Sequence, residues 1–258
     1  MKSRIFLFLA IVSVAGMLAM SGCHREDDEE SWGGNVRISR ATGELAGHGY
    51  VDLGLPSGIL WATCNVGADS PQEYGDYFAW GETEAKGNYD KYTYKYYKYD
   101  YNYYSYSDET GPFRLTKYCP RYDAEYYGYN NFYDDLTTLE PSDDAATVNW
   151  GNEWRMPTIE ECQELFDNCV HKSATYRGIH GRHFTGPNGN SIFLPAAGYR
   201  DGYILDGENT GGGYWASTLS MNRGMGVYFG FGSGSYDVTF SYFRENGFSV
   251  RPVCVLLR

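Results

Sequence analysis

The side chains best suited to binding a ligand lie in one stretch, Pro195 to Gly213, which is rich in glycine, aspartate and asparagine. It holds phenol, guanidinium, carboxylate and amide groups, which between them can donate and accept hydrogen bonds. The candidate ligand-binding residues are Tyr199, Arg200, Asp201, Asp206, Glu208 and Asn209. Because recognition residues tend to lie on loops that a rigid scaffold holds, the stretch is predicted to be a binding loop. Structural tyrosines and a β-turn arginine would explain much of it equally well.

A segment dominated by tyrosine is the second candidate for recognition. Ten of the eighteen residues from 89 to 106 are tyrosine, and a smaller Tyr-rich patch follows Cys119-Pro120. Tyrosine offers a large contact area for little lost rotamer entropy, and exposed rings would suit the C–H face of a sugar. The alternative is a low-complexity insertion with no specific role. Both interpretations place a Tyr-rich insertion at about 86–135.

The sequence contains no convincing set of catalytic residues. It has neither a G-x-S-x-G nor an H-E-x-x-H motif. His180 and His183 lie three residues apart in a Gly-containing loop, which favours solvated histidines over a shared metal. Composition alone leaves a carboxylate pair for glycoside cleavage open. We therefore expect a protein that is not an enzyme, with no catalytic residue, no metal site and no cofactor.

The N-terminus reads as a processing signal, and residues 1–22 are therefore excluded from the fold. Lys2 and Arg4 precede an apolar stretch that is too short to span a bilayer comfortably. The sequence L-A-M-S-G-C that ends at Cys23 resembles a bacterial lipobox, in which the cysteine thiol is diacylated and becomes the new N-terminus. Cys23 is thus the predicted lipid anchor, since two or three acyl chains suffice for stable membrane attachment. The alternative is an ordinary signal peptide with an incidental cysteine.

An acidic run follows the predicted anchor, at residues 26–30, and opens a stretch of low apolar content that ends near residue 48. Runs of like charge are usually solvated, so residues 23–48 are predicted to be a flexible acidic tether. The run also resembles the export signal that sends Bacteroidetes lipoproteins to the outer face of the outer membrane. The expected location is therefore the outer membrane, lipid-anchored and facing the cell exterior.

The net charge of −12 at pH 7 argues against nucleic acid or an anionic membrane surface as partner, because a phosphate backbone requires a basic face. Cationic and neutral ligands remain open. Five cysteines follow Cys23, and an exported chain meets an oxidising compartment, so two disulfides and one free thiol are expected. Their pairing cannot be read from the spacing. The wide spacings, without any C-x-x-C pair, make a metal cluster unlikely to form.

Two helices and several strands are predicted to position these groups. Thr158 and Glu161 form a capping box for a helix that ends near Cys169, and a shorter helix begins at Ser142. The apolar stripe of the longer helix comprises Cys162, Leu165, Phe166 and Cys169. Hairpins are predicted at 50–66 and 183–194, the second around an Asn-Gly step. Further strands are expected near residues 76–80, 214–219, 226–231, 236–240 and 248–256.

Six phrases occur together and in order, and jointly they resemble a known family. They are Y-V-D-L-G-L-P-S-G-I-L-W-A at 50–62, Y-G-D-Y-F-A-W-G-E at 74–82, W-R-M-P-T at 154–158, F-L-P-A-A-G-Y-R-D-G at 193–202, Y-W-A-S-T at 214–218 and G-F-S-V-R-P-V at 247–253. The family is the Fibrobacter succinogenes major paralogous domain group of Bacteroidetes lipoproteins. The resemblance covers roughly 49–258. It implies an α+β, C-type-lectin-like domain, as in formylglycine-generating enzymes, with two helices packed on a twisted antiparallel β-sheet and long loops.

The same resemblance implies a disulfide framework. In C-type-lectin-like domains a helix cysteine pairs with one on the last strand, which implies a bond from Cys162 or Cys169 to Cys254. The other helix cysteine would then pair with Cys64, leaving Cys119 free. The chain departs from the catalytic branch, because Cys254 stands alone where those enzymes have two neighbouring cysteines, and it lacks the W-N-D motif of calcium-dependent lectins.

These features together predict a surface-exposed lipoprotein with a non-enzymatic binding role. Its ligand is expected to be an extracellular glycan or another extracellular macromolecule, such as a protein. The alternative is a structural or adhesin-type component that assembles with protein partners on the cell surface. A formylglycine-generating-like or glycan-active enzyme ranks third.

Overall fold

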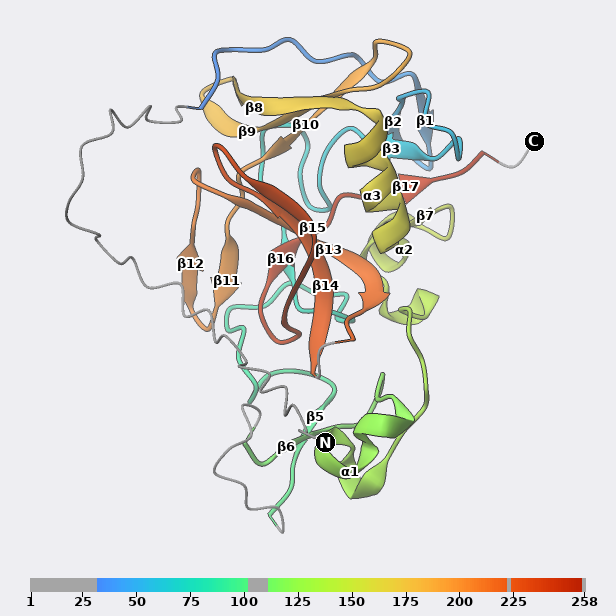
Figure 1. Cartoon of the computed structure of the whole chain (residues 1–258), viewed down its shortest axis with the longest axis vertical. Coiled ribbons are helices and arrows are strands. Elements are labelled where there is room, and N and C mark those ends of the chain that lie inside the picture. Colours follow the sequence, from blue (N-terminus) through green and yellow to red (C-terminus); the bar gives the residue numbers. More distant parts are fainter. Residues whose placement is uncertain (1–31, 102–110, 222–223, 257–258) are drawn as a thin grey trace, which may run out of the picture.

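A computed structural model describes residues 32–101, 111–221 and 224–256 of the chain. The predicted signal peptide, the predicted anchor Cys23 and the acidic run lie outside the described residues. Strands make up 37% of the structure and helices 14%, and the strands form several antiparallel sheets and a half-barrel (Figure 1). Within the stretch predicted to be a tether, Asn35 forms a β-bridge with Thr175.

A five-stranded sheet brings the beginning and the end of the domain together. Its order is β1 (Gly43–Leu45), β2 (His48–Asp52), β3 (Leu60–Ala62), β17 (Val253–Cys254) and β7 (Trp154–Arg155), and all neighbours are antiparallel. Strands β2 and β3 confirm the predicted hairpin at 50–66, with Val51 opposite Trp61.

A second five-stranded sheet forms the centre of the molecule. Its order is β15 (Tyr236–Phe243), β14 (Met225–Phe231), β13 (Gly212–Leu219), β16 (Phe248–Ser249) and β4 (Tyr77–Phe78). Only the pair β13–β16 is parallel. The helix α3 (Ile159–Asn168) lies beside β13, β14 and β15 (Figure 1). The predicted capping box of Thr158 and Glu161 is present, and Cys162, Leu165 and Phe166 are buried, which confirms the predicted apolar stripe.

Smaller sheets and short helices complete the fold. Strands β8 (Val170–Tyr176), β9 (Ile179–Thr185) and β10 (Ser191–Pro195) form one sheet, in which β9 and β10 confirm the predicted Asn-Gly hairpin. Strands β11 (Tyr199–Asp201) and β12 (Ile204–Asp206) form a hairpin, and so do β5 (Tyr97–Tyr99) and β6 (Phe113–Leu115). The remaining helices are α1 (Ala124–Tyr127), α2 (Ala145–Trp150), η1 (Arg121–Asp123), η2 (Tyr129–Asn131) and η3 (Pro141–Asp143).

The predicted α+β, C-type-lectin-like fold is wrong. The structure is mostly β, with several sheets and a half-barrel in place of two helices on one sheet. The second expected helix is present as α2, but it has only six residues, under two turns. A helix this short covers little of a sheet. In the described chain, aliphatic and aromatic side chains together bury the apolar faces of the sheets in two clusters.

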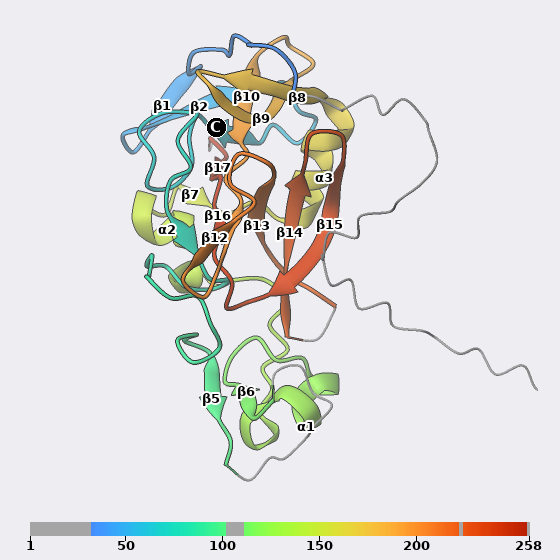
Figure 2. The same ribbon diagram turned by 90° about the vertical axis from the view of Figure 1, so that its left-hand side faces the viewer.

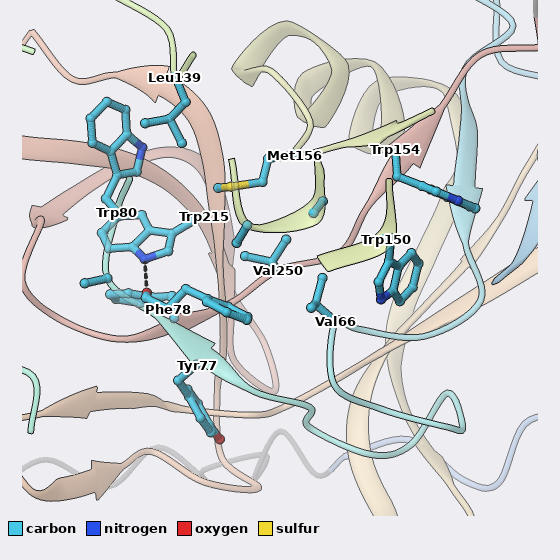
Figure 3. Packing of buried hydrophobic residues seen from close by; sticks show 14 of the residues in the cluster. Val66, Tyr77, Phe78, Trp80, Leu139, Trp150, Trp154, Met156, Trp215 and Val250 are labelled. Atoms are coloured by element: carbon cyan, nitrogen blue, oxygen red, sulfur yellow. Dashed lines mark hydrogen bonds between the residues drawn. The ribbon is translucent and has the colours of Figure 1, made fainter. Parts of the chain in front are cut away.

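Two hydrophobic clusters make up the core. The first contains the tryptophans Trp80, Trp150, Trp154 and Trp215, and Figure 3 shows how Trp80 and Trp215 lie close to Phe78. The Trp215 indole N–H donates to the carbonyl of Phe78 at 2.7 Å, and the Trp80 indole donates to the carbonyl of Ala216 at 2.9 Å. The second cluster surrounds α3 and contains Trp61 and Phe229. These indole hydrogen bonds satisfy polar atoms that burial would otherwise leave unpaired.

A buried arginine joins segments that are far apart in the sequence. Arg251 is fully buried. Its Nε donates to Asn65 Oδ1 at 2.8 Å, its Nη1 donates to the carbonyls of Ala62 and Thr63 at 3.1 Å, and its Nη2 donates to the carbonyl of Phe193 at 3.1 Å. A guanidinium offers five N–H donors in a fixed planar arrangement. Arg251 thereby ties the last part of the chain to the β3 segment and to β10.

The Tyr-rich segment forms an extension at one end of the molecule, where β5, β6 and α1 lie (Figure 2). Of the seven tyrosines from 89 to 101, Tyr89, Tyr94 and Tyr96 are buried and serve as core, whereas Tyr92, Tyr99 and Tyr101 are exposed. The exposed members leave the recognition hypothesis for this segment untested. The buried members show that part of the tract is structural.

Asp143 of η3 anchors this extension to the body of the protein. Its buried carboxylate accepts hydrogen bonds from Lys117 Nζ at 2.5 Å, from the Tyr118 hydroxyl at 2.7 Å and from Lys95 Nζ at 3.2 Å. Lys95 and Lys117 lie just outside the β5–β6 hairpin, one on each side of it. A single carboxylate therefore binds both ends of the hairpin.

The predicted disulfides are wrong, because Cys64, Cys162, Cys169 and Cys254 are all free thiols, as is Cys119. The two helix cysteines belong to the cluster around α3. Cys254 belongs to the other cluster, and Cys64 packs against that one as well. The pairs that the resemblance implied therefore lie in different parts of the core, and a disulfide requires Cβ atoms about 4 Å apart. Buried cysteine behaves here as a small hydrophobic residue.

None of the helices in the described part of the chain is long and apolar enough to cross a membrane.

Candidate ligand-binding groove

The structure divides the predicted binding loop into a hairpin and two turns. Tyr199 on β11 lies opposite Asp206 on β12, and the Tyr199 hydroxyl donates to Asp206 Oδ2 at 3.2 Å. Asp201 and Glu208 are exposed. The predicted loop is thus partly regular structure, and it brings Tyr199 and Asp206 together.

Two of the predicted binding residues have structural contacts instead. The Arg200 guanidinium lies 5.2 Å from the centre of the Tyr77 ring. Asn209 has a positive φ of 59°, a conformation that asparagine tolerates better than most residues, and its Oδ1 accepts the backbone N–H of His180 at 2.8 Å. Both side chains therefore hold the hairpin in place and leave ligand contact to their neighbours.

A groove of about 520 Å³ lies beside this hairpin, on the sheet of β13 to β16. Its walls are made by the glycines and aromatics of β11, β13, β14, β15 and β16. The lining residues are Gly198, Tyr199, Gly207, Gly211, Gly212, Gly213, Tyr228, Gly230, Phe231, Gly232, Ser235, Tyr236, Phe240, Tyr242 and Phe248. Seven are glycine, seven are aromatic, and none carries a charge. Ligand sites are typically lined in this way, by apolar and aromatic groups with few polar ones.

Four aromatic rings form a continuous row across the strands. Phe240 of β15 stacks on Tyr228 of β14 at a centroid distance of 5.3 Å and an interplanar angle of 23°. Tyr228 contacts Phe248 of β16 at 4.7 Å, and Phe248 stacks on Tyr199 of β11 at 5.4 Å and 12°. Phe248 is buried and supports its neighbours, whereas Phe240 is 41% exposed. The row thus runs from one wall of the groove to the other.

Glycines allow the rings to lie directly on the backbone. A Cβ atom at Gly213 would come within 2.3 Å of the Phe248 ring, and one at Gly212 would come within 2.5 Å of the Phe231 ring. Contacts of that length are far inside van der Waals distance. Gly213 therefore lets the Phe248 ring pack directly on β13, and Gly212 does the same for Phe231 on the opposite face of the strand.

Two phenol groups of the groove, those of Tyr199 and Tyr228, have a raised pKa and stay protonated near neutral pH. Burial raises the pKa of Tyr228 to about 12, and the nearby Tyr242 contributes in the same direction. Burial likewise raises the pKa of Tyr199, together with its interactions with Tyr242 and Asp206. A protonated phenol both donates and accepts a hydrogen bond. The groove thus combines apolar ring faces with hydroxyl groups at their edges.

The charges around the groove are mainly carboxylates. Asp206 and Glu208 lie on the hairpin side, and Asp237 directly follows Tyr236 on the opposite side. One cation, Arg182, lies 4.9 Å from the centre of the Tyr236 ring, but it is only 5% exposed, and its Nη1 donates to the carbonyl of Ser235. The accessible rim is therefore acidic.

Most of the groove was not predicted from the sequence. Only Tyr199 among the predicted residues lines it. The signal is present in the glycines and aromatics of 226–231, in the aromatics of 240–243 and in the glycine run 211–213, because glycine in a strand leaves the backbone accessible. The sequence predicts strands near 226–231 and 236–240 and places 211–213 in the binding loop, but it predicts no groove there.

The two histidines lie on strand β9 and not in a loop. His180 stacks on Trp32 at 5.2 Å, and His183 is buried. Across residues 32–101, 111–221 and 224–256, no three of the His, Cys, Asp and Glu side chains come together in a way that could hold a metal ion.

No family model matches the chain, and no curated protein or solved structure matches it either.

Proposed function

We propose that the chain is a non-enzymatic binding protein of the cell surface, and that its aromatic groove binds an extracellular glycan. The observation that carries the proposal is the row of Tyr199, Phe248, Tyr228 and Phe240 in a groove that glycines also line. A sugar ring has C–H faces that pack on aromatic rings and hydroxyl groups that form hydrogen bonds. The groove offers both kinds of partner side by side.

The arrangement suits a sugar better than a purely apolar ligand. Tyr199, Tyr228, Tyr236 and Tyr242 place phenol groups in the lining, and Ser235 adds an aliphatic hydroxyl. The Tyr199 hydroxyl already donates to Asp206, but an apolar partner that covered a hydroxyl without such a partner would cost about 1 to 3 kcal/mol for each one. A ligand that carries many hydroxyls removes this cost.

Replacing Phe240 with alanine is expected to weaken glycan binding about tenfold, because an aromatic contact contributes roughly 1 kcal/mol beyond the area it buries. The ligand is first identified on a glycan array, and the affinity is then measured by calorimetry. The matched control is Tyr203→Ala, since Tyr203 is 78% exposed at the tip of the β11–β12 hairpin and does not line the groove. Unchanged affinity of the Phe240→Ala protein, with unchanged thermal unfolding, would contradict the groove as the site.

The cell-surface part of the proposal rests on the lipobox-like sequence that ends at Cys23 and on the acidic run that follows it. Cells that express the protein are expected to incorporate a labelled fatty acid into the natural chain and not into a Cys23→Ser variant, because the thiol is the acylated group. The variant should also leave the membrane fraction. Label on the Cys23→Ser protein would disprove the anchor, and resistance of the natural protein to protease added to intact cells would disprove its exposure.

A further inference from the structure

We infer that the groove selects linear glycans without acidic groups, and that the chain of sugars lies across the strands from β15 to β11. This inference rests on the proposed function, because it assigns the class of glycan to the same groove. It follows from three observations: the direction of the aromatic row, the absence of charge in the lining, and the sign of the charges at the rim.

The direction of the row determines the shape of the ligand. Phe240 and Tyr199 lie at opposite ends of it, with Tyr228 and Phe248 between them. The side chains come from four strands, so the row crosses the strands and does not follow one of them. Phe248 is buried, so the accessible rings are Tyr199, Tyr228 and Phe240. A single sugar ring contacts one of them, whereas a chain of sugars contacts several in succession. Affinity should therefore rise with the length of the oligosaccharide.

The lining gives an acidic sugar no counter-charge. Apart from the tyrosines, none of the fifteen lining residues carries an ionisable side chain, and burial raises the pKa of Tyr199 and of Tyr228. The guanidinium of Arg182 is buried against the Tyr236 and Phe231 rings. An anionic group bound in the groove would therefore lose water without gaining an ion pair, which is unfavourable.

The carboxylates at the rim of the groove add electrostatic repulsion of an acidic sugar to this cost of desolvation. Asp206, Glu208 and Asp237 flank the two walls, and the whole chain carries a net charge of −12. Placing like charges side by side at an interface opposes binding and suppresses the wrong partners. A carboxylate or sulfate on the sugar would be repelled by these side chains, whereas a neutral hydroxyl carries no charge and is not repelled.

The test compares oligosaccharides of equal length and different charge on the purified full chain. Neutral gluco-, manno- and xylo-oligomers, from the monosaccharide to the hexasaccharide, are titrated beside oligogalacturonates and sulfated oligosaccharides. At low salt we expect at least one neutral series to bind about tenfold or more tightly than the acidic oligomers of the same length. Its monosaccharide should bind more weakly than its tetrasaccharide by a similar factor.

Charge removal at the rim gives an independent readout. The variant Glu208→Gln is expected to gain affinity for acidic oligomers at low salt and to keep its affinity for the neutral series within about twofold, because Glu208 does not line the groove and the change removes a repulsive charge. Asp201→Asn is the matched control, since Asp201 is exposed on the adjoining β11–β12 hairpin and does not line the groove.

The outcomes separate this inference from the proposed function. Acidic oligomers that bind as tightly as neutral ones, and that lose affinity in the Phe240→Ala variant, overturn the selectivity and leave the groove as a glycan site. Monosaccharide affinity equal to that of the tetrasaccharide overturns the placement across the strands. A chain that binds no oligosaccharide of either class, or binds an apolar peptide in their place, overturns both.

Discussion

Replacing Arg251 with methionine is expected to lower the free energy of unfolding by about 4 kcal/mol or more. The substitution leaves four buried acceptors without their donors, namely Asn65 Oδ1 and the carbonyls of Ala62, Thr63 and Phe193. Each unsatisfied acceptor costs roughly 1 kcal/mol or more. Methionine fills much of the same volume, so the loss reports the hydrogen bonds more than a cavity. The measurement is the midpoint of urea unfolding.

The matched control for this variant is Arg121→Met. The Arg121 side chain is 69% exposed and forms an ion pair with Asp135, and exposed pairs contribute at most about 1 kcal/mol. Domains are stable by only about 5 to 15 kcal/mol, so the Arg251→Met protein will unfold at a much lower urea concentration or fail to accumulate. If the protein fails to accumulate, its susceptibility to limited proteolysis replaces the urea midpoint as the measure of stability. Equal urea midpoints for the two variants would show that Arg251 does not hold the sheets together.

Replacing Asp143 with asparagine is expected to lower the free energy of unfolding by roughly 2 to 3 kcal/mol, because hydrogen bonds to a charged group contribute about 1.5 to 3 kcal/mol. The variant keeps the shape of the side chain and removes its charge, which weakens its bonds with Lys117, Lys95 and Tyr118. The exposed Asp135→Asn substitution is the control, since Asp135 has a positive φ of 54° that asparagine tolerates. A loss as large for Asp135→Asn as for Asp143→Asn would contradict the anchoring role.

The lowered pKa of Asp143 predicts how the stability of the protein depends on pH. Burial opposes ionisation of Asp143, but hydrogen bonds, with that from Lys117 the largest, outweigh it and lower the pKa to about 2, from an ordinary value of 3.8. A carboxyl group whose pKa is lowered by folding stabilises the protein above its unfolded pKa and loses that contribution as the pH falls. The stability that depends on Asp143 is therefore complete above about pH 4 and disappears as the pH approaches 2. Unfolding curves of the Asp143→Asn protein should lack this component, and an identical acid profile in both proteins would disprove it.

The elements predicted best were those specified by residues close together in the chain. The capping box of Thr158 and Glu161 is present because both partners lie within one helical turn. The hairpin at 183–194 is present because the Asn188-Gly189 step supplies the backbone conformation that its turn requires, with φ of 86° at Gly189. Signals of this kind need no information about the rest of the fold.

The two largest errors, the disulfides and the fold class, concern partners that lie far apart in the sequence. A disulfide was expected between helix α3 and strand β17, yet Cys162 and Cys254 belong to different hydrophobic clusters. The fold class was wrong for a related reason, because the length of α2 and the layering of the sheets depend on packing and not on local propensity. A capping signal places a helix in the sequence, but it does not say what that helix will cover.

The sequence by itself determined the local elements of this protein, its excess of acidic side chains, and the abundance of tyrosine and glycine from which a binding surface could be built. Only the tertiary structure decided where that surface lies. Tyr199, Tyr228, Phe240 and Phe248 come from four strands, and they form one row because the strands pair across the sheet and the β11–β12 hairpin lies alongside it. Hydrogen bonds between paired strands bring the four rings together, and the glycines allow the rings to pack closely. Both effects depend on contacts between residues far apart in the sequence, which no single stretch of the chain encodes.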